Sequence, residues 1–194
     1  MKLHRDKLRF SVENLLILLG AIGLVVAGLV YADAWLGSRR AVAEFKAQQL
    51  EPIAPPTPET SPTNDAALAL LSIARLELEV AIFSGTSKTT LNRGAGLVEG
   101  SSPPGTAGNI VISAHRDSYF RPLKDIRIGD VIELQLRDGI QRFKVDETFI
   151  TDPLDVSVLE PTAQPTLTLI TCYPFYYIGF APDRFIVRAI QIDS

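Results

Sequence analysis

The first part of the chain carries one long apolar segment. Residues 15–32 contain no charged side chain, and an α-helix of this length spans roughly 27 Å, close to the thickness of the hydrocarbon core of a bilayer. Four basic residues precede the segment, namely Lys2, Arg5, Lys7 and Arg9. Basic residues gather on the cytoplasmic side of membrane helices. The pattern therefore predicts a cytoplasmic segment over residues 1–14 and a single transmembrane helix over residues 15–32.

A cleaved signal peptide is the alternative interpretation of this segment. Ala32, Asp33 and Ala34 have the small-x-small form of a cleavage site. The apolar run is longer than the apolar region of most signal peptides, which favours an uncleaved anchor. Under both interpretations the residues that follow are exported. We therefore expect the remainder of the chain to lie outside the cytoplasm, at the cell membrane.

Residues 33–67 are expected to connect the anchor to a folded domain. Residues 38–50 are rich in Ala, Glu, Lys and Gln, a composition that favours a helix continuing above the membrane. Residues 51–67 contain repeated prolines, which predict a stiff, extended linker with a reach of roughly 50 Å.

From residue 68 to the C-terminus, short apolar runs alternate with turn signals, as in β-proteins. The candidate strands are residues 71–76, 80–83, 110–114, 131–136, 140–146, 166–172 and 184–192. Asp138 and Gly139 are typical of a type I′ hairpin turn, and only residues 121–126 predict a short helix. The pattern predicts one all-β domain over residues 68–194, either a small closed barrel or a sandwich.

Composition excludes some functions and narrows others. The chain has 19 Lys and Arg residues against 22 Asp and Glu residues, a net charge of −3, and no basic stripe. This distribution argues against a nucleic-acid partner. The single cysteine, Cys172, cannot form an internal disulfide, so the domain must be held together by its core.

Cys172 is itself a candidate for chemistry. A free thiol outside the cytoplasm is liable to oxidation, so an unpaired cysteine there is a candidate reactive group. The alternative is a cysteine packed as a small apolar side chain. Residues 166–172 read as a strand that Tyr173 and Pro174 end, because proline cannot donate a ladder hydrogen bond. Cys172 is therefore predicted at a strand end beside a loop, where a side chain can meet a substrate.

A thiol nucleophile needs a base, and only one histidine can supply it. His4 precedes the anchor on the cytoplasmic side, whereas His115 follows the apolar run of residues 109–114. His115 is the only candidate that can reach an exported site. Its alternative is a surface histidine at the start of a loop.

Arg184 is the best candidate for stabilising the oxyanion that forms when a thiolate attacks a carbonyl. It opens the last strand, after the loop that follows Cys172. If the two strands are antiparallel neighbours, Arg184 lies beside Cys172. Arg188 lies roughly 13 Å further along the strand and is the poorer choice, while Arg116 and Arg121 are candidates for contacts with a substrate. Each arginine could alternatively be only a solvated surface charge.

The residues around these positions resemble the sortases, the cysteine transpeptidases of bacterial surfaces. TLITC at residues 168–172 resembles the family's TLxTC signature, and ISAHR at residues 112–116 resembles its histidine segment. Arg184 falls where the family's catalytic arginine follows the cysteine. CYPF at residues 172–175 and APDRFIVR at residues 181–188 are most similar to class D sortases. The resemblance covers about residues 70–192, essentially the whole predicted domain.

The resemblance implies a closed eight-stranded sortase β-barrel with short helices and a two-step acyl transfer. Cys172 would attack the Thr carbonyl of an LPxTG-like or LPxTA-like sorting signal near the C-terminus of an exported protein and form a thioester. His115 would act as acid and then base, and Arg184 would stabilise the tetrahedral intermediates. Thr171, Tyr173 and Arg116, their neighbours in sequence, are the candidate substrate-binding residues.

The implied partners are exported proteins, the membrane, and an amine from a cell-wall precursor or another protein that resolves the thioester. No cofactor is expected. Asp152, Asp155 and Glu160 lie in a long loop where some sortases bind calcium, but acidic loops are usually only solvated, and we expect no metal. The alternatives are a cysteine hydrolase that uses water instead of an amine, and a non-catalytic, membrane-anchored β-module.

Overall fold

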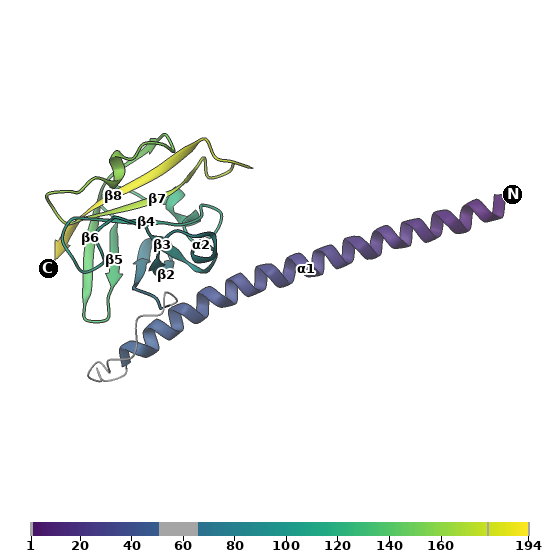
Figure 1. Ribbon diagram of the computed structural model, residues 1–194, viewed down its shortest axis with the longest axis horizontal. Helices are drawn as coiled ribbons and strands as arrows, with labels where there is room; N and C mark the ends of the chain where they lie inside the picture. Colours follow the sequence, from purple (N-terminus) through teal and green to yellow (C-terminus); the bar gives the residue numbers. More distant parts are fainter. Residues whose placement is uncertain (1, 51–65, 178, 194) are drawn as a thin grey trace. The chain divides into compact units, whose positions relative to one another are not determined.

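The computed structural model describes residues 2–50, 66–177 and 179–193 (Figure 1). Contacts divide the chain into two units, residues 1–37 and residues 38–194. The linker predicted for residues 51–67 lies almost entirely outside the described residues. The remaining sequence predictions fall on one long helix and on the β-domain.

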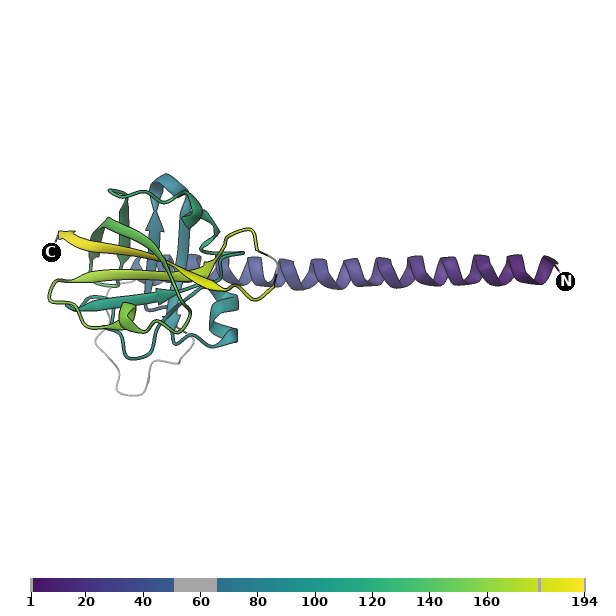
Figure 2. The same ribbon diagram turned by 90° about the horizontal axis from the view of Figure 1, so that it is seen from above.

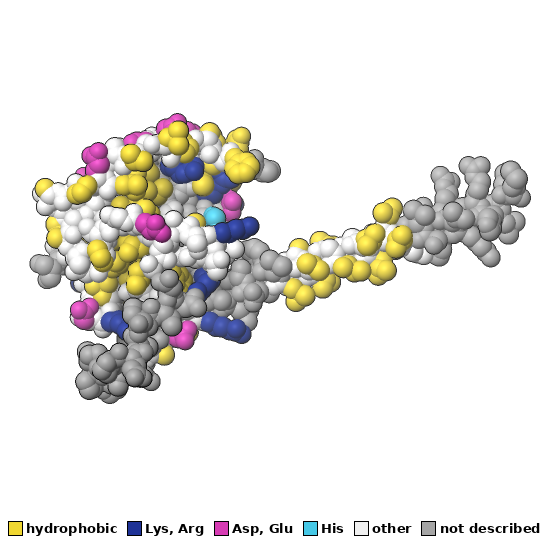
Figure 3. All heavy atoms as spheres, in the orientation of Figure 1, with side chains coloured by type: hydrophobic (Ala, Val, Ile, Leu, Met, Phe, Trp, Pro, Cys, Tyr) yellow, Lys and Arg dark blue, Asp and Glu magenta, His cyan; other side chains and the backbone are white. Residues whose placement is uncertain are grey.

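Helix α1 (Lys2–Leu50) is continuous through the apolar run of residues 15–32. The large apolar side chains described between Leu15 and Leu29 are exposed, and Figure 3 shows them as a yellow stretch along the helix. Within the described residues, no helical segment meets the length and apolarity that a membrane crossing requires.

Eight strands close into a barrel in the order β1-β2-β3-β4-β7-β8-β6-β5, and Figure 2 shows the barrel from above. The strands are β1 (Ala69–Ile73), β2 (Leu78–Ser84), β3 (Ala95–Leu97), β4 (Asn109–Ser113), β5 (Val131–Gln135), β6 (Ile140–Thr151), β7 (Thr166–Tyr173) and β8 (Asp183–Asp193). The predicted all-β class and the closed eight-stranded barrel are confirmed. Closure leaves no unpaired edge strand.

Short helices fill the connections, as expected from the resemblance. They are η1 (Ala74–Leu76), α2 (Lys88–Arg93), η2 (Arg121–Asp125) and η3 (Ser157–Leu159). The predicted helix at residues 121–126 corresponds to η2, and the predicted hairpin turn joins β5 to β6, where the N–H of Leu136 donates to the carbonyl of Gly139 at 2.7 Å.

The sequence predictions were wrong at β1 and missed β3. A strand was predicted over residues 71–76, but β1 ends at Ile73, and Glu77 then adopts a left-handed φ of 50° that turns the chain into β2. β3 spans only Ala95–Leu97 and contains Gly96, so it carries almost no strand signal. The glycine is required by space, because a Cβ there would lie 2.3 Å from the carbonyl oxygen of Gly85.

The core fixes which face each site residue occupies. Leu167 and Leu169 of β7 belong to the buried core cluster, as do Val187 and Ala189 of β8. Side chains alternate along a strand. The even-numbered side chains of both strands, including Cys172, therefore point to the outer face of the barrel.

Candidate active site

Cys172 and Arg184 are direct partners in the antiparallel ladder between β7 and β8. The sequence prediction that Arg184 lies beside Cys172 is therefore confirmed. Both residues are half-buried, while the next residues along, Tyr173 and Phe185, pack against the core. Because side chains alternate along a strand, the thiol of Cys172 and the guanidinium of Arg184 both point to the outer face of the barrel.

His115 follows β4 at the same level. β4 and β7 are parallel neighbours, with Ser113 paired to Ile170, and the N–H of Ala114 continues the register by donating to the carbonyl of Ile170 at 3.3 Å. His115 lies two residues beyond Ser113, as Cys172 lies two beyond Ile170. The exposed imidazole therefore shares the outer face and the barrel end with the thiol.

The guanidinium of Arg184 is only partly used by the protein. Its Nη1 donates to the carbonyls of Asp183 at 3.0 Å and Ala181 at 3.5 Å. Among the described residues, Nε and Nη2 have no hydrogen-bond acceptor, so these donors are available to a developing oxyanion.

The Arg188 side chain contacts residues of β6. Its Nη1 pairs with Glu147 at 2.7 Å, its guanidinium lies 5.4 Å from the ring of Phe149, and its backbone partner on β7 is Thr168. These contacts support the choice of Arg184 over Arg188.

Thr171 holds the site together from inside the barrel. It is 2% exposed, and its Oγ1 donates to the carbonyl of Ala114 at 2.8 Å. The bond joins the residue before Cys172 to the residue before His115. The burial of this side chain and its bond to the Ala114 carbonyl suit a positioning role for Thr171, whose contact with a substrate stays a prediction.

Tyr173 also faces the barrel interior. Its ring stacks on Phe185 with centroids 6.3 Å apart and meets the edge of Phe175 at 6.0 Å. This aromatic cluster closes the barrel beneath the outer face that carries Cys172. The role of Tyr173 in substrate binding stays a prediction.

Arg116, the third predicted substrate contact, is 5% exposed. Its guanidinium donates to the carbonyls of Pro174, Tyr177 and Gly179 at 2.9, 2.6 and 3.2 Å. These bonds direct the charge into the loop between β7 and β8, and a contact of Arg116 with a substrate stays a prediction. Arg121, on the same connection after β4, is exposed and lies 5.6 Å from the ring of Tyr176.

A cavity of about 340 Å³ reaches Arg184 on the outer face of the barrel. Its floor comes from Ser113, Ile170 and Ile186 of three adjacent strands. The remaining lining residues are Thr86, Leu91, Val98, Thr151, Asp152, Pro153, Asp155, Val156, Val158 and Leu159. Its lining is mainly aliphatic, and Arg184 is the one basic side chain among the described residues that line it.

Asn109 fixes the loop between β6 and β7, which forms one wall of this cavity. It is 3% exposed, and its Nδ2 donates to the carbonyls of Val158 and Glu160, both at 3.0 Å. Its Oδ1 accepts from the hydroxyl of Thr168 at 2.7 Å. Sequence reasoning missed Asn109, although a polar residue opening an otherwise apolar strand was the available signal.

The acidic residues of the same loop are satisfied locally. Asp155 accepts from the N–H of Ser157 at 3.0 Å, from its hydroxyl at 2.6 Å, and from the hydroxyl of Thr151. The Ser157 hydroxyl, followed by that of Thr151, lowers the pKa of Asp155. Asp152 accepts from the N–H of Leu154 at 2.8 Å. Within the described part of the chain, no three acidic, His or Cys residues form a group that could hold a metal.

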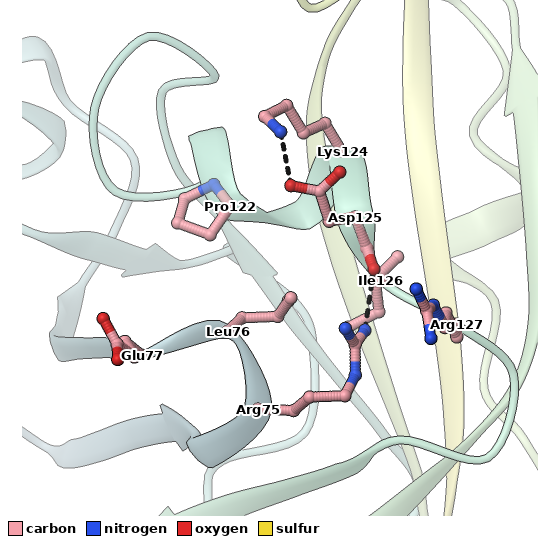
Figure 4. Close-up of a pocket in the computed structure, with 8 residues that line it drawn as sticks. All are labelled: Arg75, Leu76, Glu77, Pro122, Lys124, Asp125, Ile126 and Arg127. Carbon is pink, nitrogen blue, oxygen red and sulfur yellow. Dashed lines mark hydrogen bonds and ion pairs between the residues drawn. The ribbon is translucent and has the colours of Figure 1, made fainter.

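A second cavity, of about 640 Å³, lies between η1 and η2 (Figure 4). Two of its charged side chains, Lys124 and Asp125, pair with each other. Arg75 donates to the Asp125 carbonyl at 2.7 Å and pairs with Asp130, which lies outside the cavity lining. The Arg75 guanidinium holds the pKa of Asp130 below its usual range. This cavity contains no cysteine or histidine, so we assign the reaction to the outer-face site.

Comparisons with known proteins agree with this geometry. The sortase domain model matches residues 71–192. The chain is 35% identical over 132 residues to Sortase D of Bacillus subtilis, covering 68% of this chain and 67% of that protein. It is 30% identical over 112 residues to Sortase A of Listeria monocytogenes, covering 56% of this chain and 50% of that protein.

Solved structures give the same result. The structure of a Clostridium perfringens Sortase D5 transpeptidase superposes with a TM-score of 0.69 at 26% identity, covering 81% of this chain and 99% of that chain. The resemblance to class D sortases inferred from the residues around Cys172 and Arg184 is therefore supported by both sequence and structure.

Proposed function

Because the chain belongs to the sortase family of cysteine transpeptidases, we propose that it cleaves an LPxTG-like or LPxTA-like sorting signal of an exported protein. The new carboxyl end is joined to an amine of the cell envelope. The observation that carries this proposal is the direct pairing of Cys172 with Arg184. His115 lies two residues beyond the end of the neighbouring strand β4, and Arg184 lines a mainly aliphatic cavity.

In the first half of the reaction, the Cys172 thiolate attacks the Thr carbonyl of the sorting signal. A C–S bond forms, and the carbonyl electron pair becomes an oxyanion that accepts hydrogen bonds from Arg184. Collapse of this intermediate breaks the peptide bond. His115, as the imidazolium, gives its proton to the departing amine, which leaves a thioester on Cys172 and a neutral imidazole.

In the second half, an acceptor amine attacks the thioester. His115 takes a proton from the attacking nitrogen, and Arg184 again faces the oxyanion. The C–S bond breaks, the new amide leaves, and the thiolate and imidazolium are restored. Neither half of the reaction requires a cofactor, because the thioester keeps the acyl group activated for attack by the amine.

The cavity supports an extended peptide as the substrate. Ile170 and Ile186 provide an apolar floor that suits the leucine and proline of an LPxT sequence. Because Arg184 lines the cavity and pairs with Cys172 across the strands, a threonine carbonyl bound near Arg184 would lie close to the thiol. Apolar side chains of the substrate are thereby removed from water, which supplies binding energy without involving the reacting atoms.

We also propose that residues 15–32 anchor the enzyme in the cell membrane, with residues 1–14 in the cytoplasm and residues 68–194 outside. The uncharged run and the preceding basic residues support this arrangement. Substrates arriving through the membrane and amines of the cell envelope would both meet the enzyme on that outer side.

The test uses the chain of residues 1–194 in detergent with a library of fluorescent LPxTx peptides, with and without an amine nucleophile. We expect a cleaved peptide that is joined to the amine, and no reaction with Cys172→Ala. Release of the free acid alone, even in excess amine, would identify a hydrolase instead. No cleavage of any peptide, with Cys172→Ala and His115→Ala indistinguishable from the parent, would refute both enzymatic functions.

A further inference from the structure

Arg116 is a buried charge with backbone carbonyls as its main partners. Its side chain is 6% exposed, and its one carboxylate neighbour, Asp117, is 68% exposed. Burying a guanidinium is costly unless its donors are satisfied. Here three carbonyls satisfy them, from Pro174, Tyr177 and Gly179. The three bonds make Arg116 a polar contact between the residue after His115 and the segment that carries these carbonyls.

The element that it holds is the β7–β8 loop, residues 174–182. Two of the loop's aromatic side chains, Tyr176 and Phe180, are 74% and 101% exposed, so they contribute little packing. Phe175 is buried at the start of the loop. The one backbone bond described within the loop runs from the N–H of Tyr177 to the carbonyl of Pro174 at 3.3 Å. Arg116 therefore makes the larger share of the loop's polar contacts.

The β7–β8 loop connects Cys172 and Arg184 of the proposed active site, and Arg116 is the chain neighbour of His115, the third residue of that site. The loop starts just after Cys172 and Tyr173, and it ends at Asp183, next to Arg184. Arg116 follows His115 directly in the chain. The Arg116 guanidinium therefore links the connection after β4, which contains His115, to the β7–β8 loop. Cys172 and Arg184 lie close to the two ends of that loop.

The chemistry of the side chain fits this task. Three acceptors spread over six residues of loop require a donor group with several N–H bonds in a fixed plane. A guanidinium provides five, and it stays charged at any physiological pH. A lysine ammonium has a single nitrogen. It therefore cannot reproduce the arrangement in which one guanidinium nitrogen donates to Pro174 and another to Gly179.

We propose that Arg116 is a positioning residue that sets His115 against the Cys172–Arg184 pair through the β7–β8 loop. The proposal rests on the proposed function, because it assigns Arg116 to that same site. A positioning role differs from a purely structural one in its consequence. If Arg116 positions His115, loss of the guanidinium changes the environment of the Cys172 thiol while the barrel stays folded.

The experiment measures alkylation of Cys172 by iodoacetamide as a function of pH in the chain of residues 1–194. The pH profile of alkylation reports how the thiol interacts with His115, and it requires no knowledge of the sorting signal. The variants are Arg116→Met, which removes the charge but keeps the length, and Arg116→Lys, which keeps the charge but not the fork. Arg127→Met is the control, because it removes an exposed charge from the same connection after β4.

We expect the alkylation midpoint of Arg116→Met to shift by at least 1 pH unit, and its kcat to fall at least tenfold with KM changed less. Arg116→Lys should lie between Arg116→Met and the parent, and Arg127→Met should match the parent. An unchanged alkylation profile in folded Arg116→Met overturns the proposal. If Arg116→Met does not fold, Arg116→Lys decides in the same way: a parental profile refutes positioning and a shifted profile supports it.

Failure of the proposed function gives a different result. In that case the parent protein shows no transfer to an amine, whatever happens at Arg116. A normal parent with parental profiles in both Arg116 variants refutes only the positioning role. The near-ultraviolet circular dichroism of the aromatic cluster confirms in each case that the barrel is folded.

Discussion

Cys172 lies directly opposite Arg184 on the outer face of the barrel, one on β7 and the other on β8. Residues opposed in an antiparallel ladder have Cα atoms only about 4.5–5.5 Å apart. The register of two strands, rather than a flexible loop, therefore fixes the proposed nucleophile beside the proposed oxyanion donor. Such preorganisation lets the guanidinium stabilise charge without rearrangement during the reaction.

Replacing Arg184 tests this relationship. Arg184→Ala should lower kcat by about 10²–10³ because it removes an oxyanion donor, while Cys172 remains open to alkylation. Arg184→Lys should recover only part of the loss, since an ammonium lacks the planar fork. Steady-state kinetics with the best peptide provide the measurement. Arg188→Ala, on the same face of β8, is the matched control, and a larger loss of kcat there than in Arg184→Ala would contradict the assignment.

Thr171 offers a test of how β7 is held against β4. Thr171→Val keeps the shape but leaves the buried Ala114 carbonyl without its donor, which costs about 1–3 kcal/mol. Denaturation in urea, followed by near-ultraviolet circular dichroism so that α1 does not dominate the signal, measures the loss. Thr171→Ser keeps the hydroxyl and should stay within about 1 kcal/mol of the parent. Equal stability of Thr171→Val and the parent would show that the bond is dispensable.

The sequence predictions were accurate where the residues concerned are close together in the chain. Cys172 and Arg184 were placed correctly because one loop joins two neighbouring antiparallel strands, so sequence order determines which ends meet. Thr171 and Tyr173 were assigned to the substrate because they flank Cys172. In a strand, however, adjacent side chains point to opposite faces, and both residues lie on the inner side.

The hydrogen-bond partners of Arg116 and Asn109 could not have been predicted from the sequence. The carbonyls that bind Arg116 are separated from it by 58 to 63 residues, and those that bind Asn109 by 49 and 51 residues. No periodicity or local motif records such pairings. The closed barrel brings the start of β4 against the β6–β7 loop and the connection after β4 against the β7–β8 loop.

Asn109 provides a prediction about the cavity wall. Asn109→Ala removes the donors to the carbonyls of Val158 and Glu160 and the acceptor for Thr168. The β6–β7 loop should then be cleaved faster by a protease, and the KM for the peptide should rise about tenfold with kcat little changed. Glu160→Gln is the control, because it alters an exposed charge and keeps the backbone carbonyl. A parental KM in Asn109→Ala would separate this loop from substrate binding.

Asp155 provides the prediction for acid pH. Its pKa is lowered in the folded protein, first by the Ser157 hydroxyl and then by Thr151. A carboxyl group with a depressed folded pKa stabilises the protein above its unfolded pKa of about 3.9, and this contribution is lost as pH falls through the folded pKa. Asp155→Asn should therefore be less stable than the parent at pH 6.

The difference between the two proteins should shrink as the pH falls below about 4, because a protonated Asp155 is as neutral as asparagine. Urea midpoints measured from pH 6 down to pH 3 for parent and variant test this. Ser157→Ala should flatten the acid dependence in the same direction, since it removes the hydroxyl that contributes most to the lowered pKa. A parent-to-variant difference that stays constant across this range would mean that ionisation of Asp155 does not contribute to stability.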